Sequence, residues 1–152
     1  MPTLTRLCAF LLFGLFAVIG GERYMLLFED PPTAGSPALW LALIGAAVGW
    51  QFVGTRTNAG MAQAAWVGVQ GALLVIFWAL VAFGIAGVFA RGYARQYDGV
   101  MEALTGGFAI ALEHLERMRM APDFLVFLLA GGMVCGLICA MFFRYAERRR
   151  LG

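Results

Sequence analysis

The sequence predicts an all-α integral membrane protein: a bundle of four transmembrane helices, with an amphipathic interfacial helix between the third and fourth spans. Hydrophobic residues make up 62% of the 152 residues and charged residues 13%, whereas a soluble domain has about half and a quarter. Charge-free apolar segments long enough to cross a hydrocarbon core of about 30 Å also recur along the chain. A soluble fold of this size could not bury so much apolar surface. We therefore expect residues 1–152 to form a single membrane domain.

The first span is expected at about residues 4–26, because no charged residue interrupts the segment from Leu7 to Gly21. A cleaved signal peptide is the alternative, since one arginine precedes a compact apolar region. No clear small-x-small cleavage site follows Gly20. An uncleaved helix is therefore favoured.

The second span is expected at about residues 37–54, after a segment rich in proline and carboxylates that predicts a loop. Residues 54–58 are expected to form a tight turn, with Thr57 or Asn58 as the N-cap of the next helix. A connection this short predicts that the second and third spans are antiparallel neighbours.

The third span is expected at about residues 58–90, because no charged residue lies between Arg56 and Arg91. A single helix of this length would extend about 50 Å, which exceeds the thickness of the hydrocarbon core. It must therefore tilt or project from the membrane. Gly84 and Gly87 are the expected positions of any bend.

An amphipathic helix is expected at about residues 98–119, with Asp98 as its N-cap and Pro122 just beyond its end. Its apolar residues recur at three- and four-residue spacing; they are Met101, Leu104, Phe108, Ala111, Leu112, Leu115 and Met118. Two placements fit this pattern equally well. The helix either lies along the membrane interface or packs as a lid on the loops of the bundle.

The fourth span is expected at about residues 124–145, and a cluster of arginines marks its end. The cluster comprises Arg144, Arg148, Arg149 and Arg150. Arginines just beyond an apolar helix suit a cytoplasmic face with anionic headgroups. With an even number of spans both termini lie on one side, so we expect both in the cytoplasm. Counting all arginines favours that side by only six to five.

Small residues repeat at four-residue spacing on three of the predicted spans, which allows close approach of helix backbones. The residues that we assign to helix packing are Gly45, Gly49, Gly60, Ala64, Gly68, Gly132 and Gly136. We expect the second and third spans to form a close hairpin through these stripes.

The sequence contains no recognisable catalytic, cofactor-binding or metal-binding constellation, which favours a protein that is not an enzyme and has no cofactor. The centres of the spans lack ionisable residues, and this argues against a proton-coupled transporter or ion pump. Gln63 and Gln70 either join neighbouring helices or line a path. His114 lacks the second histidine of a bis-histidine haem site, and we expect it to be a solvated or interfacial side chain.

Cys8, Cys135 and Cys139 all lie in apolar segments and are the candidates for thiol chemistry. Cys135 and Cys139 share a helix face, and Cys8 is expected at a depth similar to that of Cys139. Thiols near a surface can reduce or trap soft oxyanions. The alternative is that each is a small hydrophobic residue.

Three short segments carry a family resemblance. They are Met1-Pro2-Thr3 before the first span; Gly49-Trp50 with Gly54, Arg56 and Gly60 around the first turn; and Tyr97-Asp98-Gly99 with Glu102-Ala103 after the third span. Together, over most of the chain, they resemble the TrgA family of small membrane proteins, which is associated with tellurite resistance in alphaproteobacteria. The resemblance implies an inner-membrane protein that alters tellurite tolerance. It implies no catalytic residues, and the cysteines are not part of the matching pattern.

Three functions are consistent with these observations. The first is a non-enzymatic bacterial inner-membrane protein for tolerance of tellurite, other oxyanions or envelope stress. The second is an accessory subunit of a respiratory or photosynthetic membrane complex, and the third is a small transporter or channel. The expected partners are the lipid bilayer and either a larger membrane complex or further copies of the chain. No basic stripe interleaved with aromatic residues points to nucleic acid.

Overall fold

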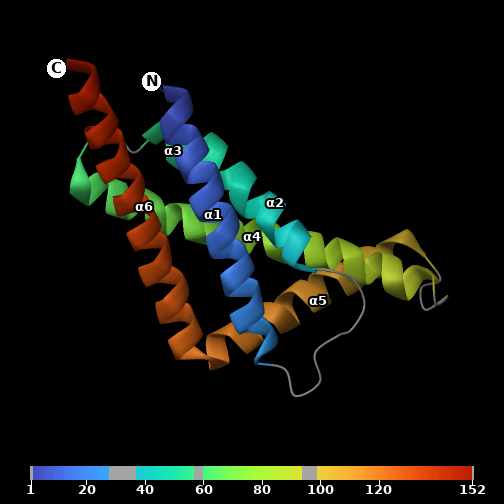
Figure 1. Cartoon of the computed structure of the whole chain (residues 1–152). Helices are drawn as coiled ribbons and strands as arrows, with labels where there is room; N and C mark the ends of the chain where they lie inside the picture. The colour runs from blue at the N-terminus through green and yellow to red at the C-terminus, as the bar shows by residue number, and fades with distance from the viewer. Residues whose placement is uncertain (1, 28–36, 57–59, 94–98, 152) are drawn as a thin grey trace.

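The computed structural model describes residues 2–27, 37–56, 60–93 and 99–151, and its regular structure within these ranges is entirely helical (Figure 1). Its elements are α1 (Pro2–Met25), α2 (Pro37–Val48), the π-helical turn η1 (Gly49–Val53), α3 (Gly54–Arg56), α4 (Met61–Tyr93), α5 (Val100–Met120) and α6 (Pro122–Leu151). Because α2, η1 and α3 follow without a break, residues 37–56 form one helix. The predicted all-helical class is confirmed.

Four of the helices are long and apolar enough to cross a membrane, as the sequence predicts. By length and composition these segments are Leu4–Met25, Pro37–Arg56, Met61–Arg91 and Pro122–Arg148. The helix α5 is not among them, because it carries acidic and basic residues along its length.

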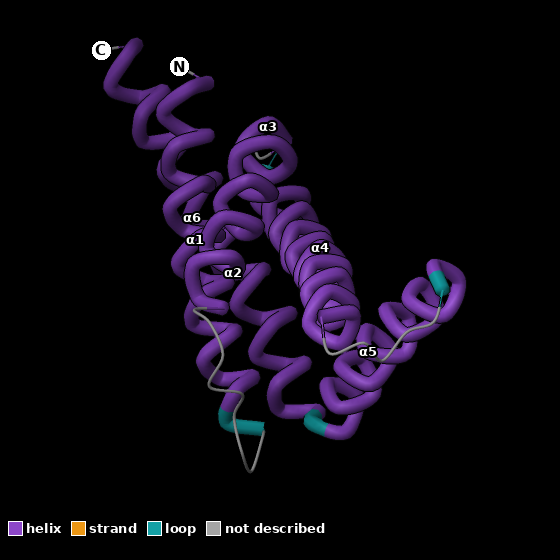
Figure 2. The backbone as a smooth tube through the Cα atoms, turned by 90° about the vertical axis from the view of Figure 1, so that its right-hand side faces the viewer, coloured by secondary structure: helices purple, strands orange, loops and turns teal. Residues whose placement is uncertain are grey.

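The helices α1, α2 and α6 run side by side, and α4 crosses them at a steep angle (Figure 1). The most extensive contacts join α1 to α2 and α4 to α6. The second half of α4 extends beyond this group and carries α5 alongside it (Figure 2). The two ends of the chain and α3 lie at the same end of the molecule (Figure 1).

Phe13 occupies the centre of the core, where α1, η1 and α4 meet. Its side chain is 0% exposed. A Cβ atom on Gly71 of α4 would lie 2.9 Å from Phe13 Cε1 and 2.7 Å from Val53 Cγ2. The glycine therefore lets the α4 backbone approach these two side chains closely.

The expected hairpin through the small-residue stripes of α2 and α4 is wrong. Gly45 of α2 and Gly49 of η1 both face α1. A Cβ atom on Gly45 would meet the backbone carbonyl oxygen of Phe13, and one on Gly49 would meet that of Ala9. Gly68 of α4 faces α6 instead, where a Cβ atom would meet the carbonyl oxygen of Gly132. Small residues reveal which face of a helix can approach a neighbour closely, but they do not specify the neighbour.

Gly136 and Ala64 belong to the same α4–α6 contact. A Cβ atom on Gly136 would meet the Ala64 carbonyl oxygen and would lie 2.8 Å from the Cα atom of Gly68. Backbone therefore lies against backbone along this part of the two helices.

Gly60 differs from the other predicted packing residues, and its assignment to helix packing is wrong. It precedes α4 with a φ of +139°, and among the described residues no atom beyond its chain neighbours lies within 4 Å of the position of a Cβ atom. Its carbonyl oxygen accepts the hydrogen bond of the Ala64 N–H group. Glycine is suited to this position because it adopts positive φ at little steric cost.

The prediction of a tight turn over residues 54–58 is also wrong for its first three residues, because residues 54–56 are helical. The Thr55 hydroxyl donates to the carbonyl oxygens of Gln51 and Phe52, which stabilises the helix end. The expected caps Thr57 and Asn58 lie outside the described residues.

The helix α4 continues through Gly84 and Gly87, the positions at which a bend was expected. Both glycines lie where α5 crosses α4. A Cβ atom on Gly84 would lie 3.1 Å from the Gly107 carbonyl oxygen, and one on Gly87 would lie 2.7 Å from Ile110 Cδ1. These glycines accommodate the neighbouring helix.

The face that α5 turns towards α4 is lined largely by small residues, and its large apolar side chains point outward. Met101 is 75% exposed and Phe108 76% exposed, whereas Ile110 and Met118 are buried. The expected N-cap Asp98 lies outside the described residues, and Gly99 occupies the N-cap position. The amphipathic pattern is thus present, but most of its apolar stripe does not face the bundle.

Candidate functional site

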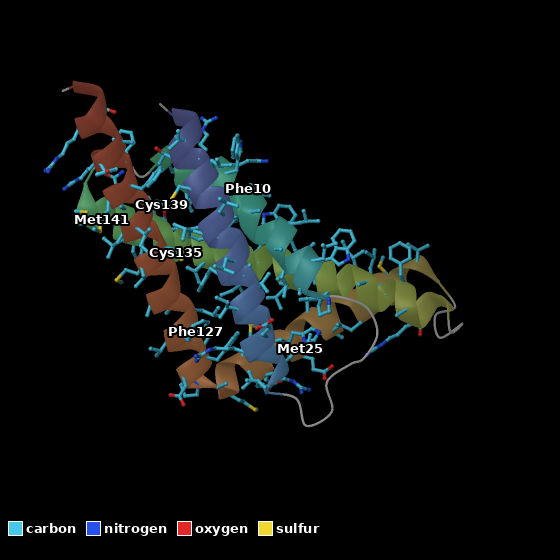
Figure 3. All side chains as sticks on the ribbon, in the orientation of Figure 1. Phe10, Met25, Phe127, Cys135, Cys139 and Met141 are labelled. Carbon is cyan, nitrogen blue, oxygen red and sulfur yellow. The ribbon has the colours of Figure 1, made fainter. Side chains whose placement is uncertain are left out.

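The three cysteines belong to α1 and α6, in the core between these helices. Cys8 of α1 packs against the hydrophobic core cluster that contains Cys135 and Cys139 of α6. Cys139 is 0% exposed and Cys135 is also buried, whereas Cys8 is half-buried. Figure 3 shows Cys135 and Cys139 on successive turns of α6. The similar depth expected for Cys8 and Cys139 stays a prediction.

The described residues contain no group of three or more His, Cys, Asp or Glu side chains placed to hold a metal ion. The cysteines therefore do not form a three-ligand metal centre in this arrangement. All three have free thiols.

Arginines surround this end of the bundle. Arg6 lies two residues before Cys8, and its Nε atom is buried without a hydrogen-bond partner in the described part of the chain. A Cβ atom on Gly54 would lie 2.8 Å from the Arg6 Cα atom, so α3 packs directly on this residue. The guanidinium carbon of Arg56 lies 4.1 Å from the centre of the Phe52 ring. Arg6 and Arg56 thus belong to the elements that pack together at this end of the bundle.

A second polar contact joins α5 to α1 in the other half of the molecule. The Tyr24 hydroxyl oxygen lies 2.7 Å from Nδ1 of His114. The imidazole also packs against the rings of Tyr24 and Phe83, with ring centres 5.9 and 6.1 Å apart. His114 is therefore not a fully solvated side chain: it is half-buried on the face of α5 turned towards the bundle.

The His114 contact could have been recognised from helix periodicity. His114 is four residues from both Ile110 and Met118, which are buried on α5. It therefore shares their face. The adjacent glutamates obscured this pattern. Its partner Tyr24, near the end of α1, is the functional candidate that sequence reasoning missed.

Beside this contact lies a cavity of about 50 Å³ between α1, α2, α4, α5 and α6. It is lined by Phe16, Ala17, Gly20, Gly21, Tyr24, Leu41, Ala72, Val75, Ile76, Ala79, Phe83, Met118, Phe124 and Leu128. Tyr24 alone among these carries a polar side-chain group. Neither Gln63 nor Gln70 lines the cavity, and Gln63 is exposed.

The charge state of His114 is set mainly by burial, which lowers its pKa below the ordinary value. Arg117 lowers the pKa further and Glu113 opposes this effect. Arg117 Nη2 and Glu113 Oε1 lie 3.4 Å apart on the same helix. When Nδ1 is unprotonated, the Tyr24 hydroxyl can donate its hydrogen bond to it.

We expect the protein to lose stability as the pH falls below about 6.5, the ordinary pKa of histidine. Because the folded pKa of His114 is lowered, the unfolded chain binds more protons in this range, and the free energy of unfolding decreases with falling pH. Thermal unfolding in detergent between pH 7.5 and 5.5 measures this effect. His114 is the single histidine of the sequence, so His114→Gln should flatten the dependence. An unchanged slope in that variant would contradict this assignment.

Comparison of the chain with protein-family models, curated proteins and solved structures finds no match.

Proposed function

We propose that the chain is a multi-pass protein of the bacterial inner membrane, with four transmembrane helices and both termini in the cytoplasm. The four long apolar helices support the membrane assignment. The two chain ends and α3 lie at the same end of the molecule (Figure 1). Arg6 lies early in α1, Arg56 ends α3 and Arg144 lies late in α6, and clustered arginines favour a cytoplasmic face. A reporter enzyme active only in the periplasm, fused to the C-terminus, should be inactive.

In this proposal α5 lies at the membrane interface. Leu104, Phe108 and Leu112 project from one exposed side of the helix. Glu113 and Glu116 are exposed on an adjoining side. A helix with neighbouring apolar and charged faces can bury the first among acyl chains while keeping the second in water.

We further propose that this protein contributes, without enzymatic activity, to tolerance of tellurite or related oxyanions. The observation that carries this proposal is the resemblance of its short segments to the TrgA family, which makes this chain a proposed member. The free thiols of Cys8, Cys135 and Cys139 are consistent with it, because thiols bind soft elements.

The minimum inhibitory concentration of tellurite in a clean deletion strain tests this function. We expect deletion to increase sensitivity and the wild-type gene to restore tolerance. A variant lacking Cys8, Cys135 and Cys139, shown to be expressed, separates two routes. If this variant restores tolerance, the thiols are not needed for the tolerance mechanism. If only the wild-type gene restores tolerance, the mechanism requires the thiols. Unchanged sensitivity on deletion would contradict the tolerance function.

An accessory role in a larger membrane complex is the second candidate, and the projecting α4–α5 pair favours it. Ile85 and Phe89 of α4 and Phe108 of α5 are large, apolar and exposed. Such surfaces can contact lipid or a partner helix. Purification in mild detergent distinguishes the roles, because an accessory subunit should recover a large partner in fixed stoichiometry.

A further inference from the structure

We propose that Tyr24 of α1 and His114 of α5 form a redox-active pair, in which a one-electron oxidant takes an electron from the Tyr24 phenol while the phenol proton moves to Nδ1 of His114. The inference goes beyond the proposed tolerance function, because it concerns neither the thiols nor tellurite. The substrate class is an outer-sphere oxidant, which accepts one electron and takes no atom from the site.

The hydrogen bond between the two side chains gives the proton a short path. The Tyr24 hydroxyl oxygen lies 2.7 Å from Nδ1 of His114, within the reach that direct proton transfer to a base requires. A neutral imidazole with its proton on Nε2 accepts at Nδ1. Because burial lowers the pKa of His114, the neutral imidazole predominates at neutral pH.

The surroundings of the phenol favour His114 over water as the proton acceptor. Tyr24 is 6% exposed, and it supplies the one polar side-chain group among the residues that line the cavity of about 50 Å³ beside it. This space exceeds what one water molecule needs, but a buried water also needs two to four polar partners, about twice what this lining offers or more. The cavity is therefore expected to be dry.

The same apolar surroundings couple the movement of the proton to that of the electron. Loss of an electron alone would leave a cationic phenol in a site without water, and burial strongly disfavours such a charge. Transfer of the proton keeps Tyr24 neutral and places the positive charge on half-buried His114. There the carboxylate of Glu113 favours the protonated imidazole, and Arg117, which opposes it, lies 3.4 Å from Glu113.

The step balances with one electron and one proton. The O–H bond of Tyr24 breaks, and an N–H bond forms at Nδ1 of His114. The electron goes to the oxidant; ruthenium(III) tris(bipyridine), for example, becomes the ruthenium(II) complex. The products are a neutral tyrosyl radical and an imidazolium group that donates a hydrogen bond to it.

Aromatic rings enclose the pair and shield the radical that forms. The Phe124 ring centre lies 5.7 Å from that of Tyr24, and the Phe83 ring centre lies 6.1 Å from that of His114. Tyr145 of α6 is 55% exposed instead. A radical on Tyr24 should therefore survive longer than one on Tyr145, which other molecules can reach.

The test uses the purified full chain in detergent micelles, with photoexcited ruthenium tris(bipyridine) as the probe and a cobalt(III) ammine complex as the final electron acceptor. The sequence has four tyrosines, so Tyr93→Phe, Tyr97→Phe and Tyr145→Phe together leave Tyr24 alone. Ring-deuterated tyrosine distinguishes its radical from tryptophan radicals by electron paramagnetic resonance. We expect a tyrosyl signal in this protein; radicals on tryptophan alone would overturn the proposal.

Isotope labelling of His114 tests the hydrogen-bonded pair without changing the site. His114 is the single histidine, so histidine enriched in nitrogen-15 labels this residue alone. We expect the tyrosyl radical to show a coupling to the labelled nitrogen, and a proton coupling that disappears in deuterium oxide. A tyrosyl radical without either coupling would overturn the proposal.

Substitution separates proton transfer from hydrogen bonding. The glutamine of His114→Gln can still accept a hydrogen bond but is a far weaker base, so we expect tyrosyl radical formation to slow about a hundredfold, the lower end of the effect of a positioned base. Glu116→Gln, a change at an exposed position of α5, should leave the rate unchanged. Size-exclusion profiles show whether each variant is folded. A folded His114→Gln protein that keeps the original rate would overturn the proposal whatever the tellurite phenotype.

Discussion

Replacing Gly68 with alanine is expected to destabilise the contact between α4 and α6 by about 3 kcal/mol, near the upper end of typical overpacking effects. The added Cβ atom would meet the carbonyl oxygen of Gly132 and would lie 3.0 Å from the Cα atom of Gly136. These are backbone atoms, so no side-chain rotation can relieve the overlap. Thermal unfolding in detergent, followed by loss of the monodisperse species, measures the effect.

Gly20→Ala is the matched control, because this glycine also lies within an apolar helix. A Cβ atom there would have one neighbour, Leu128 Cδ2 at 3.4 Å, which is ordinary van der Waals contact. The change should be neutral or should stabilise the protein by up to about 1 kcal/mol, because alanine favours helix more than glycine does. Equal destabilisation by both substitutions would contradict the close α4–α6 contact.

Phe13→Ala is expected to have the largest effect of a single substitution, about 3–5 kcal/mol lost from the free energy of unfolding. The Phe13 side chain is 0% exposed and contacts the Phe16 ring edge-on, with ring centres 6.1 Å apart. Truncation leaves a cavity where α1, η1 and α4 meet, and the loss of dispersion contacts applies in lipid as it does in water.

The control removes a ring of the same size from the outer surface of α4. Phe89 is 63% exposed, so Phe89→Ala should change the free energy of unfolding by no more than about 0.5 kcal/mol. Denaturation of both variants in the same detergent compares them directly. Similar losses would show that Phe13 is not at the centre of the core.

The helical class and the four long apolar helices could be predicted because each depends on local composition and length. The helix partners could not. Gly45 and Gly68 offer a partner the same small surface, and nothing local to α2 or α4 shows that the first faces α1 and the second α6. Gly60 was misassigned because the sequence does not distinguish a glycine of positive φ from one inside a helix.

For the candidate site, too, the sequence indicates some features and misses others. An even number of spans predicts similar depth for Cys8 and Cys139, and the structure places Cys139 in the core cluster with Cys8 packed against that cluster. The Tyr24–His114 hydrogen bond was missed, because it depends on which side of α5 faces the bundle. The large apolar residues of α5 mostly project outward, so their spacing does not reveal which side contacts the bundle.

The short junction between α5 and α6 couples the position of α5 to that of the bundle. Ala121 alone separates the two helices, and its carbonyl oxygen accepts hydrogen bonds from Phe124 and Leu125 at the start of α6. So short a connection leaves α5 little freedom to swing independently. A change in the tilt of α5, for example in a membrane of different thickness, would therefore displace the first turn of α6 and strain the Tyr24–His114 hydrogen bond.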